Sequence, residues 1–310
     1  MKLSAFRPAA QAIALLLLMG PLLVLARPNG EAEANSPVLQ RIRTSQVVRV
    51  IHDESVPFSY RDANQRSVGY SIDLCQSVVE ALRRDMRLPG LRAEHVMVGT
   101  DERVKAIASG QADLECGAAT NNAERRKQVA FSMTHFFTGA RLLVRTSSGV
   151  KKLSDLNGKR IATLAETTVA EQLKWQNSVG LTRNSVVIAR SDEHAFALLQ
   201  KGEVEAYAMD DILLYALRAG SKTPDEWAIV GEFMSFDPLA VMLPKDPAFK
   251  RLVDRAIAAA MLDGHVERLY RKWFEAGIPP SGVKLSVPMN SQLREQLRYP
   301  TDKVGDEFGA

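Results

Sequence analysis

Short apolar runs alternate with amphipathic stretches along most of the chain. Arg49-Val50-Ile51 is an apolar run that a loop separates from a helical pattern beginning near Ile72. A second apolar run, 159–164, is followed by a helical pattern from Val169. Short apolar runs predict buried strands, and the helices between them predict crossover connections in parallel sheets. The pattern therefore predicts an α/β protein.

Two stretches, 106–113 and 198–205, share one pattern. Each contains a helix end, a glycine and an acidic residue that leads into a strand, as AIASGQAD and LLQKGEVE. A glycine that ends a helix just before a strand is typical of α/β connections. Ala118 and Asp210 lie eight residues beyond the two glycines. The repeat predicts two α/β lobes of similar build.

Loops that carry polar residues follow the predicted strands at 52–60, 117–125, 165–168 and 210–211. Ligands of parallel sheets bind outside the carboxyl ends of the strands. We therefore expect these four loops to line one site, in a cleft between the lobes.

Residues 1–26 have the form of a secretory signal peptide. Lys2 and Arg7 give a basic start, 12–19 is an apolar block, and Val24-Leu25-Ala26 ends in a small residue suited to cleavage. An uncleaved membrane anchor is the alternative, which a Gly-Pro break inside the apolar stretch disfavours. We expect a soluble exported protein, located in the periplasm.

The composition agrees with a globular protein of about two domains. The chain has 310 residues, of which 46% are hydrophobic and 25% charged, and only two are cysteines. These values exclude a disordered chain and a Cys-rich zinc domain. The 40 basic and 36 acidic residues give a net charge of +4 with no long basic run, so nucleic acid is not favoured as a partner.

Common enzyme motifs are missing from the sequence. There is no G-x-S-x-G, Walker A, G-x-G-x-x-G or H-E-x-x-H motif, and the five histidines have no metal-binding spacing. Asp210-Asp211 is a candidate catalytic pair, but adjacent side chains usually point apart and no base or metal partner lies nearby. We expect no catalysis, no metal and no cofactor.

Export changes how Cys75 and Cys116 are interpreted, because thiols outside the cytoplasm tend to pair. Cys75 lies in a helical segment, 73–84, and Cys116 ends a strand-like segment, 112–116. A helix packed on a sheet would bring the two sulfur atoms together. We expect a disulfide, and two buried free thiols are the alternative.

One set of polar residues suits a zwitterion. Arg125 presents a planar fork to a carboxylate, with Thr120 at the other end of the same turn. Thr167 and Thr168 precede a helix whose free amides favour an anion, and Asp210 can pair with an ammonium. Each residue has a structural alternative: the arginine as a solvated charge, the threonines as a helix cap only, and the aspartate as the cap of the next helix.

Several segments of the chain resemble the periplasmic solute-binding proteins of polar amino-acid ABC importers, in particular the glutamate/aspartate-binding branch. The resemblance extends over about 37–303. The matching segments are SVPFSY at 55–60, VGYSIDLC at 68–75, ECGAATNN at 115–122, Glu124-Arg125, MDD at 209–211 and IPP at 278–280.

The resemblance implies a type II periplasmic-binding-protein fold, in which two hinge strands join two α/β lobes around a ligand cleft. Lobe 1 would then be discontinuous, with 37–145 and 233–303, and lobe 2 would span 146–232. The crossings between the lobes would lie near Leu142–Arg145 and Phe233–Val241.

By position, the resemblance also implies roles for individual residues. Arg125 would hold the α-carboxylate of the ligand, and Thr120 would contact the carboxylate and the amino group. Ala118 would offer its backbone carbonyl, the two threonines before the second-lobe helix would bind the carboxylate, and Asp210 would bind the ammonium. Phe58 would pack on the carbon chain of the ligand, with a place in the core as the alternative.

The residues that would contact the ligand's side chain depart from the acidic branch at two positions. There an Arg usually follows the His of the first strand, whereas here Asp53 follows His52, and Asp192 stands where that branch tends to place a His. Thr100 and Arg103 look retained. If both aspartates face the pocket, glutamine, asparagine or a basic amino acid is the alternative ligand. The sequence leaves the directions of both side chains open.

Together, the resemblance implies a monomeric extracytoplasmic protein that captures an α-amino acid and delivers it to the membrane permease of an ABC importer. Glutamate and aspartate are favoured as ligands. Two other functions stay open: a periplasmic dehydratase-like enzyme on the same fold, and a secreted amino-acid sensor.

Overall fold

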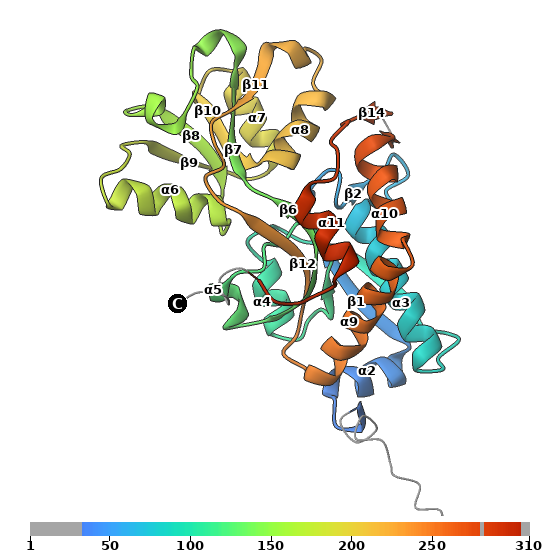
Figure 1. The fold of residues 1–310 in the computed structure, drawn as a ribbon. Helices are drawn as coiled ribbons and strands as arrows, with labels where there is room; N and C mark the ends of the chain where they lie inside the picture. Colours follow the sequence, from blue (N-terminus) through green and yellow to red (C-terminus); the bar gives the residue numbers. More distant parts are fainter. Residues whose placement is uncertain (1–32, 280–281, 305–310) are drawn as a thin grey trace, which may run out of the picture.

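Two separate β-sheets divide the computed structural model of the chain into two lobes, joined where the chain crosses between them (Figure 1). The structure describes residues 33–279 and 282–304, so the predicted signal peptide at 1–26 lies outside the described residues. Within the described part of the chain, no helix has both the length and the apolar character needed to cross a membrane.

Lobe 1 contains both ends of the described chain. Its five-stranded sheet has the order β4 (Arg92–Met97), β1 (Val47–His52), β5 (Leu114–Glu115), β12 (Asp237–Leu243) and β6 (Ala130–Thr138). Its helices are α2 (Pro37–Ser45), α3 (Tyr70–Asp85), α4 (Arg103–Ala108), α5 (Ala123–Arg126), α9 (Pro247–Leu262), α10 (His265–Tyr270) and α11 (Ser291–Arg298). Two hairpins complete this lobe, β2–β3 (Tyr60–Arg61 with Ser67–Val68) and β13–β14 (Gly277–Ile278 with Val283–Lys284).

Lobe 2 repeats this plan on a smaller scale. Its sheet has the order β11 (Trp227–Val230), β7 (Ala140–Arg145), β10 (Ala206–Asp210), β8 (Arg160–Leu164) and β9 (Ser185–Ala189). Its helices are α6 (Thr168–Ser178), α7 (Asp192–Gln200) and α8 (Asp211–Gly220). Lobe 2 thus has the α/β build that the sequence repeat predicts.

Both sheets are mixed rather than purely parallel. The first sheet has three parallel strands, β1, β4 and β5, and the second has β8, β9 and β10. β12 in the first sheet and β7 in the second are antiparallel to their neighbours. The reason is the double crossing between the lobes. β12 and β7 begin at the junction and run away from it, whereas the parallel strands end there.

The first crossing lies earlier than the sequence predicts. β6 ends at Thr138 and β7 begins at Ala140, so 142–145 is already part of the second sheet. The prediction fails here because only Gly139 separates β6 from β7, so no loop marks the change of sheet. The second crossing connects β11 to β12 through 231–236 and overlaps the predicted range.

The acidic residues of the sequence repeat have the same structural role in both lobes. Asp113 precedes β5 and accepts the Arg49 N–H of the neighbouring β1 at 2.7 Å. Glu205 precedes β10 and accepts the Arg160 N–H of the neighbouring β8 at 2.8 Å. Each carboxylate therefore satisfies a backbone donor at the start of a parallel strand and helps to fix the register of two central strands.

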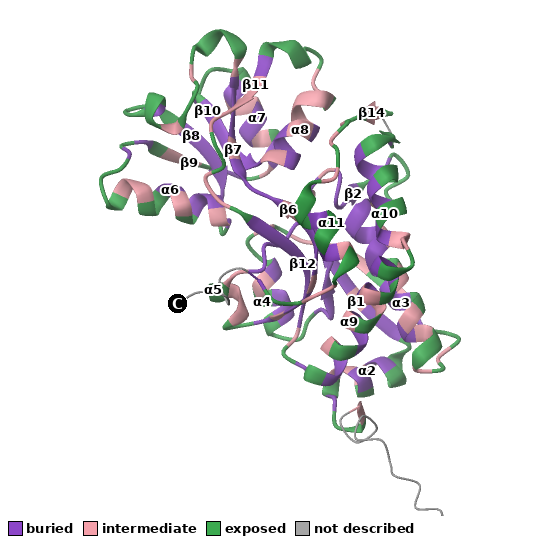
Figure 2. Cartoon of the chain, viewed as in Figure 1, coloured by how far each residue is buried: buried purple, intermediate pink, exposed green. Residues whose placement is uncertain are grey.

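The core of lobe 1 contains an aromatic cluster, and buried strands run through the middle of both lobes (Figure 2). Phe58 is fully buried in this cluster, with its ring 5.0 Å from Phe136, 5.6 Å from Phe274 and 6.0 Å from Tyr70. The expected ligand contact at Phe58 is therefore wrong, because the ring packs in the core instead. The cluster anchors the loop that follows β1.

A disulfide joins Cys75 of α3 to Cys116, the residue after β5. The expected pairing is thus confirmed. The bond closes a loop across 41 positions and fixes α3 beside the loop that leaves β5. This loop carries Thr120 and leads to α5, so the disulfide anchors one wall of the site described below.

The double variant Cys75→Ala/Cys116→Ala should lower the free energy of unfolding by about 4 kcal/mol. The reason is that an open loop of this length regains chain entropy in the unfolded state. Urea unfolding of the exported protein measures this loss, and wild type unfolded with a reducing agent should move toward the variant. Equal midpoints with and without the reductant would show that the disulfide does not form in the exported protein.

Candidate functional site

The carboxyl ends of strands from both sheets meet at the junction between the lobes. Asp53 follows β1, Thr100 follows β4, and Thr120 follows β5 in lobe 1. In lobe 2, Asp210 ends β10, and the loop after β8 leads to Thr167 at the start of α6. The topology therefore brings the predicted polar loops together, as expected for α/β sheets.

Arg125 extends from lobe 1 to lobe 2. Its Nη1 donates to the Thr120 carbonyl at 3.1 Å, and its Nη2 donates to the Glu166 carbonyl at 2.9 Å. The neighbouring Lys127 instead pairs with Glu124 on the exposed surface. Arg125 is thus not a solvated member of a basic run. Burial lowers its pKa, and the guanidinium keeps further N–H groups for a carboxylate.

The start of α6 provides amides for an anion. The Thr167 hydroxyl caps the helix, because it accepts the Ala170 N–H at 3.1 Å and donates to the Leu164 carbonyl at 2.8 Å. The amides of Thr168 and Val169 lie in the first turn, where no carbonyl of the helix can reach them. The capping alternative is therefore correct for the Thr167 side chain, while the helix terminus stays suited to an anion.

Asp210 is a buried carboxylate without full compensation. It occupies the position before α8, yet its side chain makes no capping hydrogen bond. The Oδ1 atom is buried and has no hydrogen-bond partner among the residues that the structure describes. Burial and repulsion from Asp237 and Asp211 raise the pKa of Asp210 well above its usual range. A carboxylate oxygen left in this state fits an ammonium group.

Asp237, the first residue of β12, is a site residue that the sequence analysis missed. Its carboxylate accepts the Ser235 hydroxyl, and the hydroxyls of Thr168 and Thr120 also hydrogen-bond to it. Burial raises the pKa of Asp237, and these three hydroxyls oppose the shift. It thus links hydroxyls from both lobes and repels Asp210. The sequence places it inside the predicted crossing, but no motif distinguishes it from its neighbours.

Asp53 and Arg103 form a buried ion pair at the other end of the site. Arg103 Nη1 lies 3.1 Å from Asp53 Oδ2 and 3.3 Å from Glu115 Oε1. The Thr100 hydroxyl donates to Asp53 Oδ2 at 2.9 Å, and the Ser55 hydroxyl donates to Oδ1 at 3.0 Å. The direction of Asp53 is thereby settled, because its carboxylate points inward at the guanidinium.

Glu115 is a second residue that sequence reasoning missed. It is fully buried at the end of β5, and its Oε2 atom lacks a hydrogen-bond partner within the described chain. Burial raises its pKa to about 7, against the opposing effect of Arg103. An acidic residue beside the disulfide, in an otherwise apolar strand, is the signal that could have identified it.

Asp192 lies across the junction in lobe 2. It is the first residue of α7, but Ser191 caps that helix, so the Asp192 carboxylate turns inward and accepts the Tyr207 hydroxyl. Burial, together with weaker repulsion from Glu193 and Asp53, raises its pKa to about 7 against the opposing effect of the Tyr207 hydroxyl. Both aspartates that depart from the acidic branch therefore face the site.

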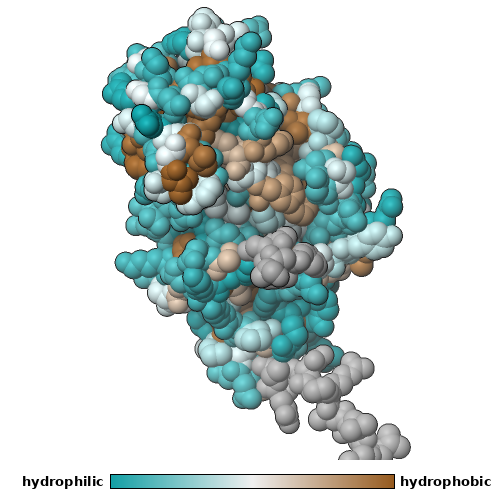
Figure 3. Space-filling model, turned by 60° about the vertical axis from the view of Figure 1, so that its left-hand side comes forward, coloured by the Kyte–Doolittle hydropathy of each residue, from teal (hydrophilic) through white to brown (hydrophobic). Residues whose placement is uncertain are grey.

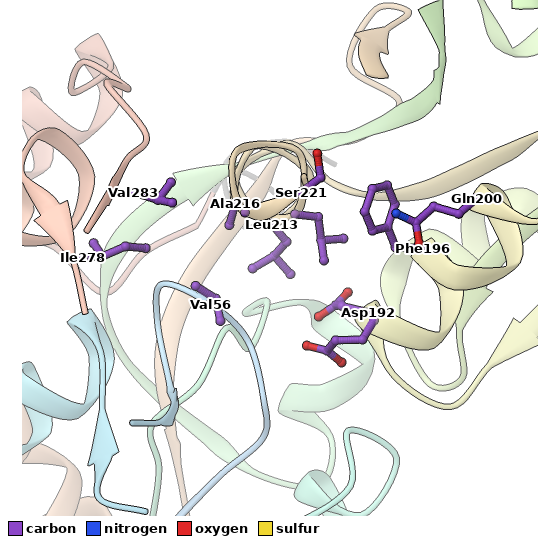
Figure 4. A pocket seen from close by; sticks show the side chains of 12 residues that line it. Val56, Asp192, Phe196, Gln200, Leu213, Ala216, Ser221, Ile278 and Val283 are labelled. Atoms are coloured by element: carbon purple, nitrogen blue, oxygen red, sulfur yellow. The ribbon is translucent and has the colours of Figure 1, made fainter. Parts of the chain in front are cut away.

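Asp192 also borders a cavity of about 370 Å³ (Figure 4). Phe196 and Leu213 of lobe 2 line this cavity, and Val56 and Ile278 of lobe 1 lie opposite them. The walls are mostly apolar around the carboxylate of Asp192. The cavity thus continues the side-chain end of the site between the two lobes.

Ala118 lies in the loop between β5 and Thr120 and is nearly buried. This position agrees with the expected backbone contact, although its methyl group adds no polar function. The predicted residues therefore form two groups: Arg125, Thr120, Thr167, Thr168 and Asp210 at one end, and Arg103, Thr100, Asp53 and Asp192 at the other. Phe58 belongs to neither group.

Comparisons with known proteins agree on one family. The model of the bacterial extracellular solute-binding proteins, family 3, matches residues 48–276. The L-glutamate/L-aspartate-binding protein of Pseudomonas aeruginosa is 37% identical over 280 residues, which cover 89% of this chain and 93% of the relative. The glutamate/aspartate import solute-binding protein of Escherichia coli K12 is 35% identical over 300 residues, 96% of this chain and 98% of the relative. Among solved structures, an ancestral arginine-binding protein bound to arginine aligns with a TM-score of 0.66 at 27% identity, and covers 74% of this chain and 98% of that chain.

The variant Asp210→Asn should lose ligand binding and yet unfold at a higher urea concentration than wild type without ligand. Replacing a repelled, uncompensated carboxylate by an amide of the same shape should raise the free energy of unfolding by about 1 kcal/mol. Urea unfolding and titration calorimetry on the same preparations measure both effects.

Asp211→Asn is the matched control, because Asp211 accepts the Thr138 hydroxyl at 2.7 Å and an amide oxygen can still do so. It should bind ligand within about twofold of wild type. If Asp210→Asn instead lowered stability and kept affinity, the carboxylate would have a structural role and no role in binding.

Proposed function

The chain belongs to family 3 of the bacterial extracellular solute-binding proteins, and on this basis we propose that it captures an α-amino acid and delivers it to the permease of an ABC importer. One observation supports this most strongly. Arg125 of lobe 1 and Asp210 of lobe 2 place opposite charges at one junction, and neither charge is fully compensated there. An α-amino acid carries the two complementary charges on adjacent groups.

The α-carboxylate would bind between Arg125 and the start of α6. The guanidinium offers N–H groups beyond the two that bind backbone carbonyls, and the amides of Thr168 and Val169 add donors from lobe 2. The ammonium would donate to Asp210 Oδ1. A ligand bound in this way contacts both lobes, so it stabilises the arrangement in which they lie together.

The relatives named for glutamate and aspartate import make these two amino acids the first ligands expected from the family resemblance. Delivery to a membrane permease and a periplasmic location are proposed on the same basis, with residues 1–26 as the export signal. We also propose a monomer.

A role in binding rather than catalysis suits the chemistry of the site. Arg125 and Asp210 complement charges that an amino acid already carries, so holding the ligand needs no bond to break and no proton to move. The dehydratase-like enzyme and the secreted sensor are the alternative functions. A neighbouring pair of genes for a permease and an ATPase would favour import over both.

The variant Arg125→Ala should bind amino acids at least about thirtyfold more weakly while it keeps its fold. Truncating one partner of a buried, charge-assisted contact costs roughly 2–5 kcal/mol. Titration calorimetry with a mixture of the twenty amino acids, and then with each binder, measures the loss. Lys127→Ala removes an exposed charge two positions away and should bind like wild type. Unchanged affinity of a folded Arg125→Ala would sink the proposed function.

Ligand should also draw the lobes together in solution. Arg125 and Asp210 lie in different lobes and must contact one small molecule, which favours closure of the hinge between the lobes. Small-angle X-ray scattering should show a smaller radius of gyration with saturating ligand, and Arg125→Ala should not respond. An unchanged radius in the wild type, under conditions where calorimetry shows binding, would place the ligand outside the junction.

A further inference from the structure

The side-chain end of the site carries more carboxylates than cations. Resting on the amino-acid capture proposed above, we propose that this end selects a side chain that donates hydrogen bonds and carries no negative charge. Glutamine, asparagine or a basic amino acid would then bind more tightly than glutamate or aspartate. The chain would thus differ from its named relatives in the ligand side chain that it prefers. Arg125 and Asp210 would still bind the α-carboxylate and the ammonium of the ligand.

The positive charge of Arg103 is already neutralised by two carboxylates. Its guanidinium lies 3.1 Å from one carboxylate oxygen of Asp53 and 3.3 Å from one of Glu115, and its Nε donates to the Thr100 carbonyl at 3.2 Å. All three acidic and basic side chains are at most 5% exposed. A ligand carboxylate that approached Arg103 would therefore meet two carboxylates on the same guanidinium.

Hydrogen bonds from three neighbouring hydroxyl groups hold Asp53 in this position. Hydroxyls of Ser55 and Thr100 donate to its two carboxylate oxygens, and the Ser59 hydroxyl donates to its backbone carbonyl at 2.8 Å. Gly117 leaves room for the arrangement, because a Cβ atom there would lie 2.6 Å from Asp53 Oδ1 and 2.5 Å from Glu115 Oε1. The two carboxylates are packed against this backbone, so Asp53 is a fixed part of the site.

Lobe 2 adds another acid to this end of the site, and among the described residues no base forms an ion pair with it. Asp192 is buried opposite Asp53, and a tyrosine hydroxyl occupies only its Oδ1 atom. Glu193 lines the adjoining cavity beside it. Arg103 thus contacts two buried carboxylates, Asp192 adds a third from lobe 2, and a ligand carboxylate would be a fourth. Burying that charge without a free cation is costly, whereas a donor group gives the carboxylates the partner they lack.

A carboxamide meets both demands of this site. Its oxygen accepts from a guanidinium N–H, and its nitrogen donates to a carboxylate. A lysine or arginine side chain would donate to the carboxylates and lay its carbon chain along the apolar walls formed by Val56, Phe196 and Leu213. Both kinds of side chain share the chemistry proposed here, and the experiment separates them.

The test is titration calorimetry of the mature protein at pH 7.5 with six amino acids. Glutamine and glutamate have the same shape and differ in charge, as do asparagine and aspartate, while arginine and lysine add the cation. The better amide should bind at least tenfold more tightly than the matching acid, or a basic amino acid should bind more tightly than both acids. If glutamate or aspartate binds most tightly, the inference is overturned and the proposed function stands. If none of the six binds but another of the twenty amino acids does, the inference is overturned and the proposed function stands. If none of the twenty binds, both fail.

Two variants, one in each lobe, test the cause. Asp53→Asn keeps an oxygen that accepts from Thr100 and frees the charge of Arg103, so the affinity for glutamate should rise at least tenfold while that for glutamine changes less than threefold. Asp192→Asn should shift the same ratio in the same direction. Asp192→Asn keeps an oxygen that accepts from the Tyr207 hydroxyl. The single amide oxygen of Asp53→Asn can accept from Thr100, and its NH2 group then faces the Ser55 hydroxyl, which must accept instead of donate. Either variant suffices if the other does not fold.

Glu94→Gln is the control, because it removes an exposed carboxylate of lobe 1 that pairs with Arg92 on the surface. It should leave the ratio of glutamate to glutamine affinity unchanged. An unchanged ratio in both aspartate variants would show that these carboxylates do not set the selectivity and would overturn the inference.

Discussion

The junction between the lobes depends on charges that are buried but incompletely paired. Arg125 donates one N–H group to a backbone carbonyl of each lobe. Asp210 has a buried carboxylate oxygen for which the described residues provide no hydrogen-bond donor. Burial disfavours both charges, as the directions of their pKa shifts show. The fold must therefore hold two unfavourable groups in place until a ligand with complementary charges arrives, and most of its other features contribute to that task.

Rigid elements on each side of the junction provide this support. In lobe 1, the disulfide fixes the loop after β5, and the aromatic cluster around Phe58 fixes the loop after β1. In both lobes an acid before a central strand satisfies a neighbouring backbone donor, at Asp113 and at Glu205. The face of the molecule in Figure 3 is mostly hydrophilic, with apolar side chains gathered in patches on lobe 2 and between the lobes. The incompletely paired charges of Arg125 and Asp210 thus lie at the junction, between two lobes that packing and backbone hydrogen bonds hold in place.

The sequence predicted the build of the lobes and the clamp residues because both leave local patterns. A single short segment is enough to show an apolar run, a glycine that ends a helix, or the polar residues that follow a strand. The crossing at 138–140 was misplaced because a single residue separates β6 from β7, so no loop marks the change of sheet. Phe58 was assigned to the ligand because a loop phenylalanine has no pattern that separates core from cleft. Asp237 and Glu115 were missed for a similar reason. Each becomes informative only when distant segments meet, and no single segment carries that information.

Affinity and selectivity have different physical origins in this site. The proposed clamp of Arg125 and Asp210 complements groups that every α-amino acid carries, so it would raise affinity for all of them alike. Discrimination is a difference between affinities, and it requires groups that treat one side chain worse than another. Asp53 can do this because it is fixed by Ser55 and Thr100 and already satisfies Arg103. A flexible acid could turn to solvent and admit a negatively charged ligand at little cost, whereas a buried, hydrogen-bonded acid must be overcome. Under the proposed selectivity, the ion pair that holds the loop after β1 would therefore also supply the repulsive element of recognition.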